Sequence, residues 1–466
     1  MISYLKRLIP VNIFKKLQPI YHYILAWLAN LIYAFPSKKI IVIGVTGTAG
    51  KTSVVYLIVR ALEEAGWPAG YSSTTQFSDG QREWLNDKKM TMPGRFFLPK
   101  LLRRMVKNGC RFAVIETTSQ GIEQFRHRFI NYDTVVVTGL YSEHIEAHGS
   151  FENYKKAKGK LCSHLKKYPQ KYINEGRQVV KAKGKLNKLE LNRVKKTLIV
   201  NGSDKHGQYF LSFLADNKMA LIKTEEEKKA LLEENKNLQT YKQDNVKTSN
   251  QGTSFSLEDN NFDLKLYGDF QADNASLAAI TTHSYGADFG QIKDGLEKIS
   301  ALAGKMEKIN AGQEFLTIVD YAFEPVALEK LYQLISVFNY NRIIHVLGSA
   351  GGGRDKARRP KLGKIAGAKA DLVVVSNEDP YDEDPQLIID QVASGANLVG
   401  KKEEVDLFKI LDRREAINFA LKQAKKDDLV LITGKGAEQF ICSTKSQKIA
   451  WDDRKVARQE LEKICG

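Results

Sequence analysis

The stretch that constrains this chain most is a glycine loop held between an apolar run and a helical pattern. The run KIIVIGVTG (39–47) is continuous and ends in glycine, which is typical of a buried parallel strand. Residues 51–66 then show helical periodicity and end in Gly66. The loop TGTAGKTS therefore lies between a strand and a helix, where open α/β sheets bind phosphate groups.

This loop keeps the lysine and hydroxyl of a phosphate-binding loop but changes the usual glycine spacing. The ordinary pattern has a glycine five residues before Gly50, and Val45 stands there instead. Backbone N–H groups can surround an anion, the Lys51 ammonium adds positive charge, and the Thr52 hydroxyl can ligate Mg²⁺. We therefore predict that nucleotide phosphates bind to the loop residues Gly47, Thr48, Gly50, Lys51, Thr52 and Ser53.

Further apolar runs predict an α/β fold around this loop. FAVIETTS (112–119) and DTVVVTGL (133–140) are typical of buried strands that end in polar residues at a ligand-binding edge. From about residue 304, four apolar runs alternate with helical segments, which predicts a Rossmann-like α/β unit. The signal is weaker over 181–261, where KTEEEKKALLEENKNLQ (223–239) is expected to be a solvated helix or loop.

These patterns divide the chain into three predicted parts. They are an apolar and basic helical segment (1–38), a central nucleotide-binding domain with a mostly parallel sheet (39–302), and a C-terminal α/β domain (303–466). The first part contains YILAWLANLIYAF (23–35), which is too short to span a bilayer comfortably. We expect a helix packed on the domain, and the alternative is peripheral contact with a membrane surface through residues 1–35.

The charge and the cysteines exclude several classes of protein. The formal net charge is +17, and residues 155–196 alone hold fifteen Lys and Arg against two Glu. A lysine-rich surface explains this, with an anionic substrate or membrane as the alternative. Nucleic acid is not expected as a partner because no recognisable binding module accompanies the charge. Four scattered cysteines fit neither a zinc site nor a disulfide framework, so a cytoplasmic location is expected.

Three residues outside the loop raise the question of a metal site. Glu116 ends an apolar run at the ligand-binding edge, and its carboxylate oxygens suit Mg²⁺. His144 and Lys158 follow the next run. A histidine can ligate a metal, whereas a lysine ammonium cannot unless CO₂ converts it to a carbamate. These residues alone leave the roles of His144 and Lys158 open.

A series of short motifs follows the loop along the chain. In order they are TMP (91–93), ETTSQGIEQFR (116–126), LYSEHIEAHG (140–149), YKKAKGKL (154–161), GDFQADNASLAAI (268–280), GKMEKI (304–309), VDYAFEP (319–325), GSAGGGRDKARRP (348–360), DPYDEDP (379–385), DRREAI (412–417) and TGKGAEQF (433–440). Together with the loop, this series resembles the Mur ligase superfamily, and most closely its UDP-N-acetylmuramyl-tripeptide synthetase type. The family joins amino acids or peptides to carboxylates using ATP, through an acyl phosphate.

The resemblance implies a role for each matched residue. Lys51 and Thr52 would hold the ATP phosphates and one Mg²⁺ with Glu116, while His144 and carbamylated Lys158 would hold a second Mg²⁺. The adenosine would be held by Asn274, Lys305 and Asp320. The substrates would be held by Thr91, Ser119 and Arg126 on the acceptor side and by Arg354, Glu378, Asp379, Gly434 and Glu438 on the amino-acid side.

Two departures from the family pattern bear on the substrates. The family has an additional N-terminal domain for the UDP end of its acceptor, whereas residues 1–38 precede the first strand here, so a lipid-linked acceptor is one possibility. The family has an arginine that selects diaminopimelate, and Tyr381 stands in its place in this chain. This replacement removes a bidentate partner for a distal carboxylate. Glu378 and Asp379 would suit a cationic side chain such as that of lysine.

We therefore expect a monomeric, ADP-forming ligase that adds an amino acid to a carboxylate acceptor. The expected acceptor is a muramyl-peptide precursor of peptidoglycan. One alternative is another ligase of the superfamily, of the folylpolyglutamate or cyanophycin type. The other is a non-enzymatic regulatory or nucleic-acid-binding protein with a phosphate loop, favoured only by the basic tract.

Overall fold

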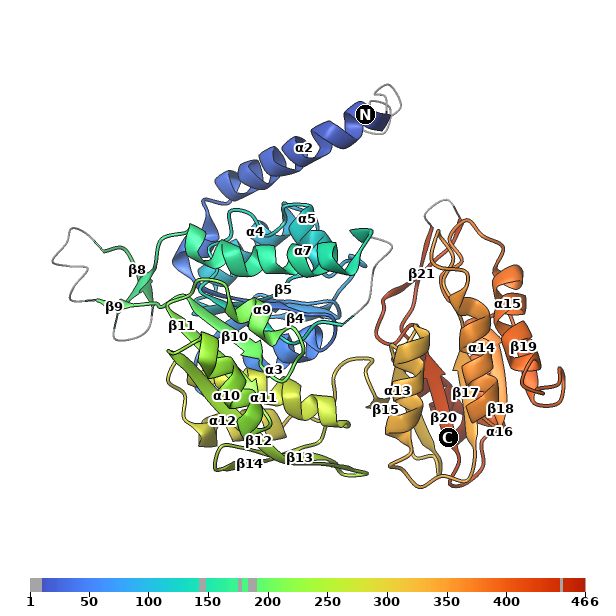
Figure 1. Cartoon of the computed structure of the whole chain (residues 1–466). Coiled ribbons are helices and arrows are strands. Elements are labelled where there is room, and N and C mark those ends of the chain that lie inside the picture. The colour runs from blue at the N-terminus through green and yellow to red at the C-terminus, as the bar shows by residue number, and fades with distance from the viewer. Residues whose placement is uncertain (1–10, 142–147, 175–177, 183–190, 445–446, 466) are drawn as a thin grey trace. The chain divides into compact units, whose positions relative to one another are not determined.

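The computed structural model describes residues 11–141, 148–174, 178–182, 191–444 and 447–465. The chain forms two compact units (Figure 1). Unit 1 comprises Met1–Lys247, Thr253–Leu264 and Asp269–Lys298, and unit 2 comprises Thr248–Gly252, Lys265–Gly268 and Ile299–Gly466.

Unit 1 is built on an eleven-stranded sheet. Its strands, in spatial order, are β14 (Asn260–Leu264), β13 (Gly252–Leu257), β12 (Leu238–Ser249), β11 (Asn217–Ile222), β10 (Thr197–Asn201), β6 (Thr134–Val137), β1 (Ile41–Thr46), β5 (Phe112–Glu116), β2 (Ala69–Ser72), β3 (Gln76–Ser78) and β4 (Glu83–Leu85). The run from β12 to β2 is parallel, with β1 between β6 and β5. The loop after β1 therefore leaves the middle of the sheet at its carboxyl edge.

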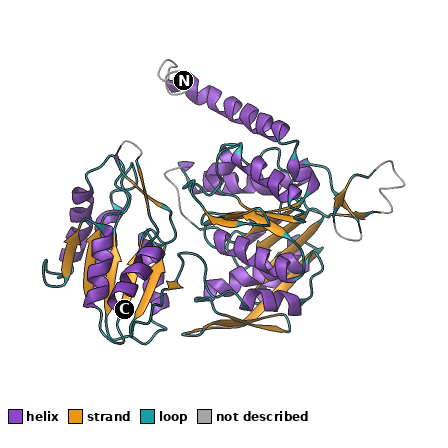
Figure 2. Ribbon diagram, turned by 180° about the vertical axis from the view of Figure 1, so that it is seen from behind, coloured by secondary structure: helices purple, strands orange, loops and turns teal. Residues whose placement is uncertain are grey.

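Helices cover both faces of this sheet, as Figure 2 shows. The helices in the described part of unit 1 are α2 (Val11–Ile32), η1 (Pro36–Lys39), α3 (Lys51–Glu64), α4 (Phe97–Lys107), α5 (Ser119–Glu123), α7 (Phe151–His164), η2 (Leu165–Lys167), α9 (Gly207–Leu211), α10 (Glu225–Glu234), α11 (Asp269–His283) and α12 (Phe289–Glu297). The helices α4, α5 and α7 lie on one face, and α3, α11 and α12 lie on the other (Figure 1). A small separate sheet has the order β8 (Val179–Val180), β7 (Tyr172–Ile173) and β9 (Asn192–Arg193).

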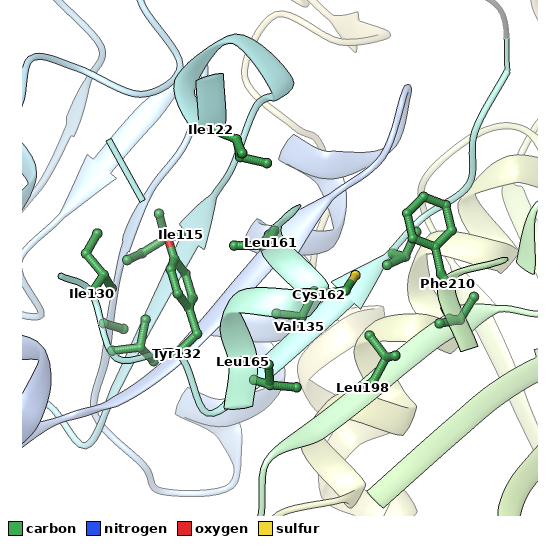
Figure 3. Close-up of a cluster of buried hydrophobic side chains, with 14 of the residues drawn as sticks. Ile115, Ile122, Ile130, Tyr132, Val135, Leu161, Cys162, Leu165, Leu198 and Phe210 are labelled. Carbon is green, nitrogen blue, oxygen red and sulfur yellow. The ribbon is translucent and has the colours of Figure 1, made fainter. Parts of the chain in front are cut away.

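The hydrophobic core under α4 and α7 holds α7 on the sheet. Alternate residues of the strands point to this face because side chains alternate along a strand. Figure 3 shows Leu161, Cys162 and Leu165 of α7 and η2 packed near Val135 and Leu198 of the sheet. The next turns of α7 therefore hold their side chains at fixed positions near the glycine loop.

Unit 2 has a six-stranded sheet with helices on both faces. Its order is β15 (Glu307–Lys308), β16 (Leu316–Asp320), β20 (Leu429–Thr433), β17 (Ile343–Leu347), β18 (Leu372–Ser376) and β19 (Leu407–Ile410), all parallel except β15. The helices are α13 (Pro325–Ile335), α14 (Arg358–Lys369), α15 (Pro385–Asn397), α16 (Arg413–Gln423) and α17 (Asp453–Cys465), and a hairpin joins β21 (Phe440–Cys442) to β22 (Lys448–Ala450).

The predicted fold class, a mostly parallel α/β sheet followed by a Rossmann-like α/β unit, is confirmed. Within the weakly predicted stretch 181–261, β10, β11 and β12 extend the main sheet, and α10 begins at a capping box formed by Thr224 and Glu227. No helix in the part of the chain that the structure describes is long and apolar enough to cross a membrane.

Candidate active site

The glycine loop adopts a conformation that needs glycine at two positions. Gly50 caps the N-terminus of α3 with φ +79°, and a Cβ there would overlap Oδ1 of Asn274. Gly47 has φ +147°, and a Cβ there would overlap the Thr138 hydroxyl. The predicted adenosine residue Asn274, which also donates to Gln271 Oε1 over 3.1 Å, thus lies directly against the loop.

Lys51 and Lys158, the lysines predicted for the phosphate and metal sites, both donate to backbone oxygens of this loop. Lys51 Nζ donates to the Thr48 carbonyl over 2.8 Å. Lys158, on α7, is 1% exposed, and its Nζ donates to the Gly47 carbonyl over 2.6 Å. Its ammonium also lies 4.6 Å from the centre of the Tyr154 ring, and the Tyr154 hydroxyl donates to Thr48 Oγ1 over 3.1 Å. Residues more than a hundred positions apart therefore converge on one loop.

Glu116 forms the second half of the site. Thr52 Oγ1 donates to Glu116 Oε2 over 3.0 Å, while the backbone N–H and the hydroxyl of Thr74 donate to its two oxygens over 2.7 and 2.9 Å. The Thr91 hydroxyl lies 2.8 Å from the Thr74 hydroxyl. A hydroxyl and a buried carboxylate thus stand together at the start of α3, and such oxygens are the ligands that Mg²⁺ prefers.

The remaining member of the predicted metal set, His144, lies outside the described residues. Among the residues that the structure does describe, no group of three or more His, Cys, Asp and Glu side chains could hold a metal ion. Thr74 was missed by the sequence analysis because it belongs to none of the motifs, and only the fold brings it to Glu116.

On the acceptor side, Ser119 and Arg126 occupy the segment that follows β5. Ser119 Oγ lies 3.0 Å from Nε2 of His148. Arg126 donates to Gln124 Oε1 over 2.7 Å and to the Met92 carbonyl, and burial, followed by the nearby Arg95, lowers its pKa. His148 was not predicted, although it stands in the LYSEHIEAHG motif four residues after His144.

In unit 2, a buried lysine joins two of the predicted substrate residues. Lys435 Nζ donates to Asp379 Oδ2 over 3.0 Å and to Glu438 Oε2 over 2.5 Å. The Tyr321 hydroxyl donates to the other Glu438 oxygen over 3.0 Å. Lys435 was not predicted either, although it lies in the middle of the TGKGAEQF motif. The predicted residues Asp379 and Glu438 are therefore held together through a cation.

Glu378 is a buried carboxylate whose Oε2 atom has no hydrogen-bond partner. Burial raises the pKa of Glu378 to about 7, against the opposing effect of the Lys435 and Arg413 charges. Gly434, with φ +106°, has no side chain. A Cβ there would lie 2.6 Å from Oε2, so the glycine keeps the space beside this atom open. The site therefore holds an acid that a proton or a cationic ligand would stabilise.

Of the other predicted residues of unit 2, Lys305 forms a β-bridge with Leu302, Arg354 lies on a loop, and Asp320 ends β16. Asp320 accepts hydrogen bonds from the backbone N–H groups of Met306 and Ala322 over 2.8 and 2.7 Å. Burial raises the pKa of Asp320, and the positive charge of Lys305 opposes that effect. Arg354 is exposed on the glycine-rich loop after β17.

The raised pKa of Glu378 predicts a pH-dependent stability. An unfolded glutamate has a pKa near 4.5, so in the folded state Glu378 keeps its proton up to a higher pH than in the unfolded state. The free energy of unfolding therefore falls as the pH rises from 4.5 through 7. Glutamine cannot ionise, so we expect the free energy of unfolding of Glu378→Gln, relative to that of the wild type, to increase by on the order of 3 kcal/mol from pH 5 to pH 8. Urea unfolding of both proteins at the two pH values measures this. The exposed Glu329→Gln is the control, and an equal difference at both pH values would contradict the expectation.

Comparisons with known protein families identify the class. The Mur ligase middle domain model matches residues 45–192, and the model described as "Mur ligase, glutamate ligase domain" matches residues 304–436. The chain belongs to the Mur ligase family. It is an ATP-dependent ligase that forms amide bonds, so the sequence-based prediction of an enzyme of this class is confirmed.

Individual relatives agree with this assignment. A UDP-N-acetylmuramyl-tripeptide synthetase of Roseiflexus sp. (strain RS-1) is 33% identical over 449 residues, covering 94% of this chain and 82% of the relative. A UDP-N-acetylmuramoyl-L-alanyl-D-glutamate--2,6-diaminopimelate ligase of Syntrophomonas wolfei subsp. wolfei is 32% identical over 444 residues, covering 94% and 81%.

Solved structures share the fold. A diaminopimelate ligase of the same name has a TM-score of 0.57 at 24% identity and covers 92% of this chain and 79% of its own. Mycobacterium tuberculosis folylpolyglutamate synthase, complexed with ADP and AMPPCP, has a TM-score of 0.61 at 14% identity and covers 88% and 92%.

Proposed function

We propose that this ligase adds an amino acid to the carboxylate of a muramyl-peptide precursor of peptidoglycan. The observation that carries the proposal is the convergence of Lys51, Thr52, Glu116 and Lys158 on one glycine loop. The relatives' names supply the substrate class: they act on UDP-N-acetylmuramyl peptides. The Lys51 ammonium and the hydroxyl groups of Thr48 and Thr52 at the loop support ATP as the phosphoryl donor.

The residues at the loop fit ATP and magnesium. The positive φ angles of Gly47 and Gly50 shape the loop before α3, and backbone N–H groups at the start of a helix favour a phosphate. Thr52 and Glu116 would hold one Mg²⁺, and His144 with carbamylated Lys158 would hold a second. Bound Mg²⁺ neutralises charge on the phosphoryl group as it moves.

The chain's own residues would then act in a defined order. The acceptor carboxylate, held near Ser119 and Arg126, attacks the γ-phosphorus, and the bond to ADP breaks to give an acyl phosphate. The Lys51 ammonium and the loop N–H groups stabilise the negative charge during this transfer. The amine of the incoming amino acid attacks the acyl carbon and loses a proton, and inorganic phosphate leaves. Unit 2 is proposed to supply that amino acid, with Glu438 near its amine.

We further propose that the incoming amino acid carries a cationic side chain, as lysine does. Glu378 has an unpartnered buried oxygen, and Tyr381 replaces the arginine that would pair with a distal carboxylate. A bound ammonium would stabilise the ionised form of Glu378, which burial otherwise disfavours. Arg354, Asp379 and Gly434 are proposed to line the same amino-acid site.

Substrate-dependent phosphate release tests this function. With ATP, Mg²⁺ and UDP-N-acetylmuramoyl-L-alanyl-D-glutamate, we expect release with lysine to exceed release with diaminopimelate by about 10-fold or more in kcat/KM, because a charge-assisted hydrogen-bond pair is worth roughly 1.5–3 kcal/mol. Glu378→Gln should reduce this preference, and Glu329→Gln should not. Preference for diaminopimelate would contradict the proposed side-chain class, and no release with any amino acid would contradict the muramyl acceptor.

The predicted monomeric state and cytoplasmic location stay predictions, as does the way in which the UDP end of the acceptor is held. Light scattering of the purified chain measures the first of these directly.

A further inference from the structure

The N-terminal helix α2 presents its large apolar side chains to solvent. The residues on its packed side include the small Ala26 and Ala29 and the polar Asn30, all buried. The exposed apolar residues are Leu17, Ile20, Tyr21, Tyr23, Ile24, Trp27, Leu28, Leu31 and Ile32, and Ile20 and Ile32 are 57% and 59% exposed. These nine residues, which we call the α2 stripe, show the reverse of the pattern expected for a helix that is only packed on a domain.

The spacing of the α2 stripe places it on one side of the helix. Its members recur at intervals of three and four, as in Ile20, Ile24, Trp27 and Leu31, and residues at this spacing share a helix face. A contiguous exposed apolar surface of this kind marks a site of interaction, since single exposed apolar residues are common but rows of them are not.

The C-terminal half of α2 is held on unit 1, so the stripe has a fixed direction. The Tyr23 ring packs against the Phe125 and Phe129 rings, with centroids 6.2 and 5.1 Å apart. The Phe35 N–H donates to the Asn30 carbonyl over 2.7 Å and closes the end of the helix. Figure 1 shows α2 on the side of the sheet that carries α4, α5 and α7.

Cationic side chains flank the anchored end of the stripe. Arg95 donates to the carbonyl of Gln124, the residue before Phe125, over 3.1 Å, Arg128 lies 5.5 Å from the Phe125 ring centre, and Lys38 lies 4.7 Å from the Phe35 ring centre. Buried Nε atoms of Arg95 and Arg128 have no hydrogen-bond partner. Among the described residues, no carboxylate forms an ion pair with Arg95, Arg128 or Lys38, so within that part of the chain this end of the stripe is positively charged.

We propose that the α2 stripe lies in the interface of an anionic lipid bilayer, with Arg95, Arg128 and Lys38 at the phosphate level. Apolar residues interleaved with Trp and Tyr are typical of helices that lie in this interface, and basic side chains beside them bind anionic headgroups. A second copy of the chain is disfavoured as the occupant, because it has the same formal net charge of +17 and offers no anionic complement to these cations. This proposal does not depend on the ligase chemistry.

Vesicle co-sedimentation of the full chain tests the proposal. We expect binding to vesicles that contain phosphatidylglycerol to exceed binding to pure phosphatidylcholine vesicles by about 10-fold or more, and to weaken as salt is raised. Ile24→Glu and Trp27→Glu should each reduce binding by about 10-fold or more, because a charge then enters the apolar layer. Leu214→Glu is the matched control, since Leu214 is 77% exposed in the same unit but lies outside the stripe.

The possible outcomes separate the occupants. Equal binding to both vesicle types, or no binding to either, overturns the proposal. A lipid-free dimer that Trp27→Glu dissociates assigns the stripe to a second copy and also overturns it. Circular dichroism and thermal unfolding confirm that each variant is folded. Phosphate release from soluble substrates is measured in parallel and should be unchanged in Trp27→Glu, so failure of the lipid proposal and failure of the proposed ligase reaction can be told apart.

Discussion

Replacing Lys158 with alanine is expected to lower kcat of the ligation reaction by about 10²- to 10³-fold, the loss typical when one preorganised charged group is removed. The buried ammonium lies 2.6 Å from the Gly47 carbonyl, beside the loop that is proposed to hold the phosphates. If Lys158 acts as a carbamate, short carboxylates such as acetate should partly restore turnover by occupying the vacated space. Phosphate release with and without added carboxylate measures both effects.

The neighbouring Lys160→Ala is the control for this experiment. Lys160 lies on the same helix, α7, but it is exposed and pairs with Glu123 over 2.7 Å. Its removal should leave kcat within about 2-fold, because exposed ion pairs contribute little. Thermal unfolding shows whether Lys158→Ala is still folded. A ¹³C NMR signal from labelled CO₂ that is present in the wild type and absent in Lys158→Ala would report the carbamate directly. Full activity of folded Lys158→Ala would contradict the assigned role.

Replacing Lys51 with alanine is expected to lower kcat by about 10³-fold or more, because its charge is proposed to accompany the phosphoryl group through the transition state. Lys51→Arg should not restore activity fully, since a planar guanidinium does not replace a compact ammonium. Nucleotide affinity, measured by titration calorimetry, should fall less than kcat does, because only interactions that strengthen in the transition state affect the chemical step.

The exposed Lys107→Ala, at the end of α4, is the control for Lys51→Ala. The double variant Lys51→Ala/Lys158→Ala should be little worse than the poorer single variant, because residues that act as a unit are not additive. Losses that multiply would indicate that the two lysines act in separate steps.

The local structure around the candidate site could be predicted because its signals are local in the sequence. The apolar run of β1, the glycines at 47 and 50 and the helical pattern of α3 lie within a short segment, and strand, loop and helix geometry follow from it. The same local logic placed Glu116 at the end of a buried strand. The strands β10 to β12 were missed as a continuation of the sheet, because membership of a parallel sheet depends on partners far away in sequence.

Three features of the site were decided by tertiary structure. Thr74 reaches Glu116, His148 reaches Ser119, and Lys435 joins Asp379 to Glu438. The contacts of Thr74, His148 and Asp379 depend on where packed strands and helices place side chains, whereas Lys435 and Glu438 are only three residues apart. The missing partner of the Glu378 Oε2 atom is likewise a property of the folded unit, because only burial separates that atom from water.

The sequence alone determined that this chain has an α/β fold with a glycine loop between a strand and a helix, since both follow from apolar periodicity and from residues adjacent in the chain. It also showed an apolar N-terminal helix but left open which side of it would be covered. The tertiary structure decided that question: the small Ala26 and Ala29 are buried, whereas most of the large apolar side chains are exposed. The physical reason is that composition sets how apolar a helix is, whereas only its packing against neighbouring elements sets which face meets water.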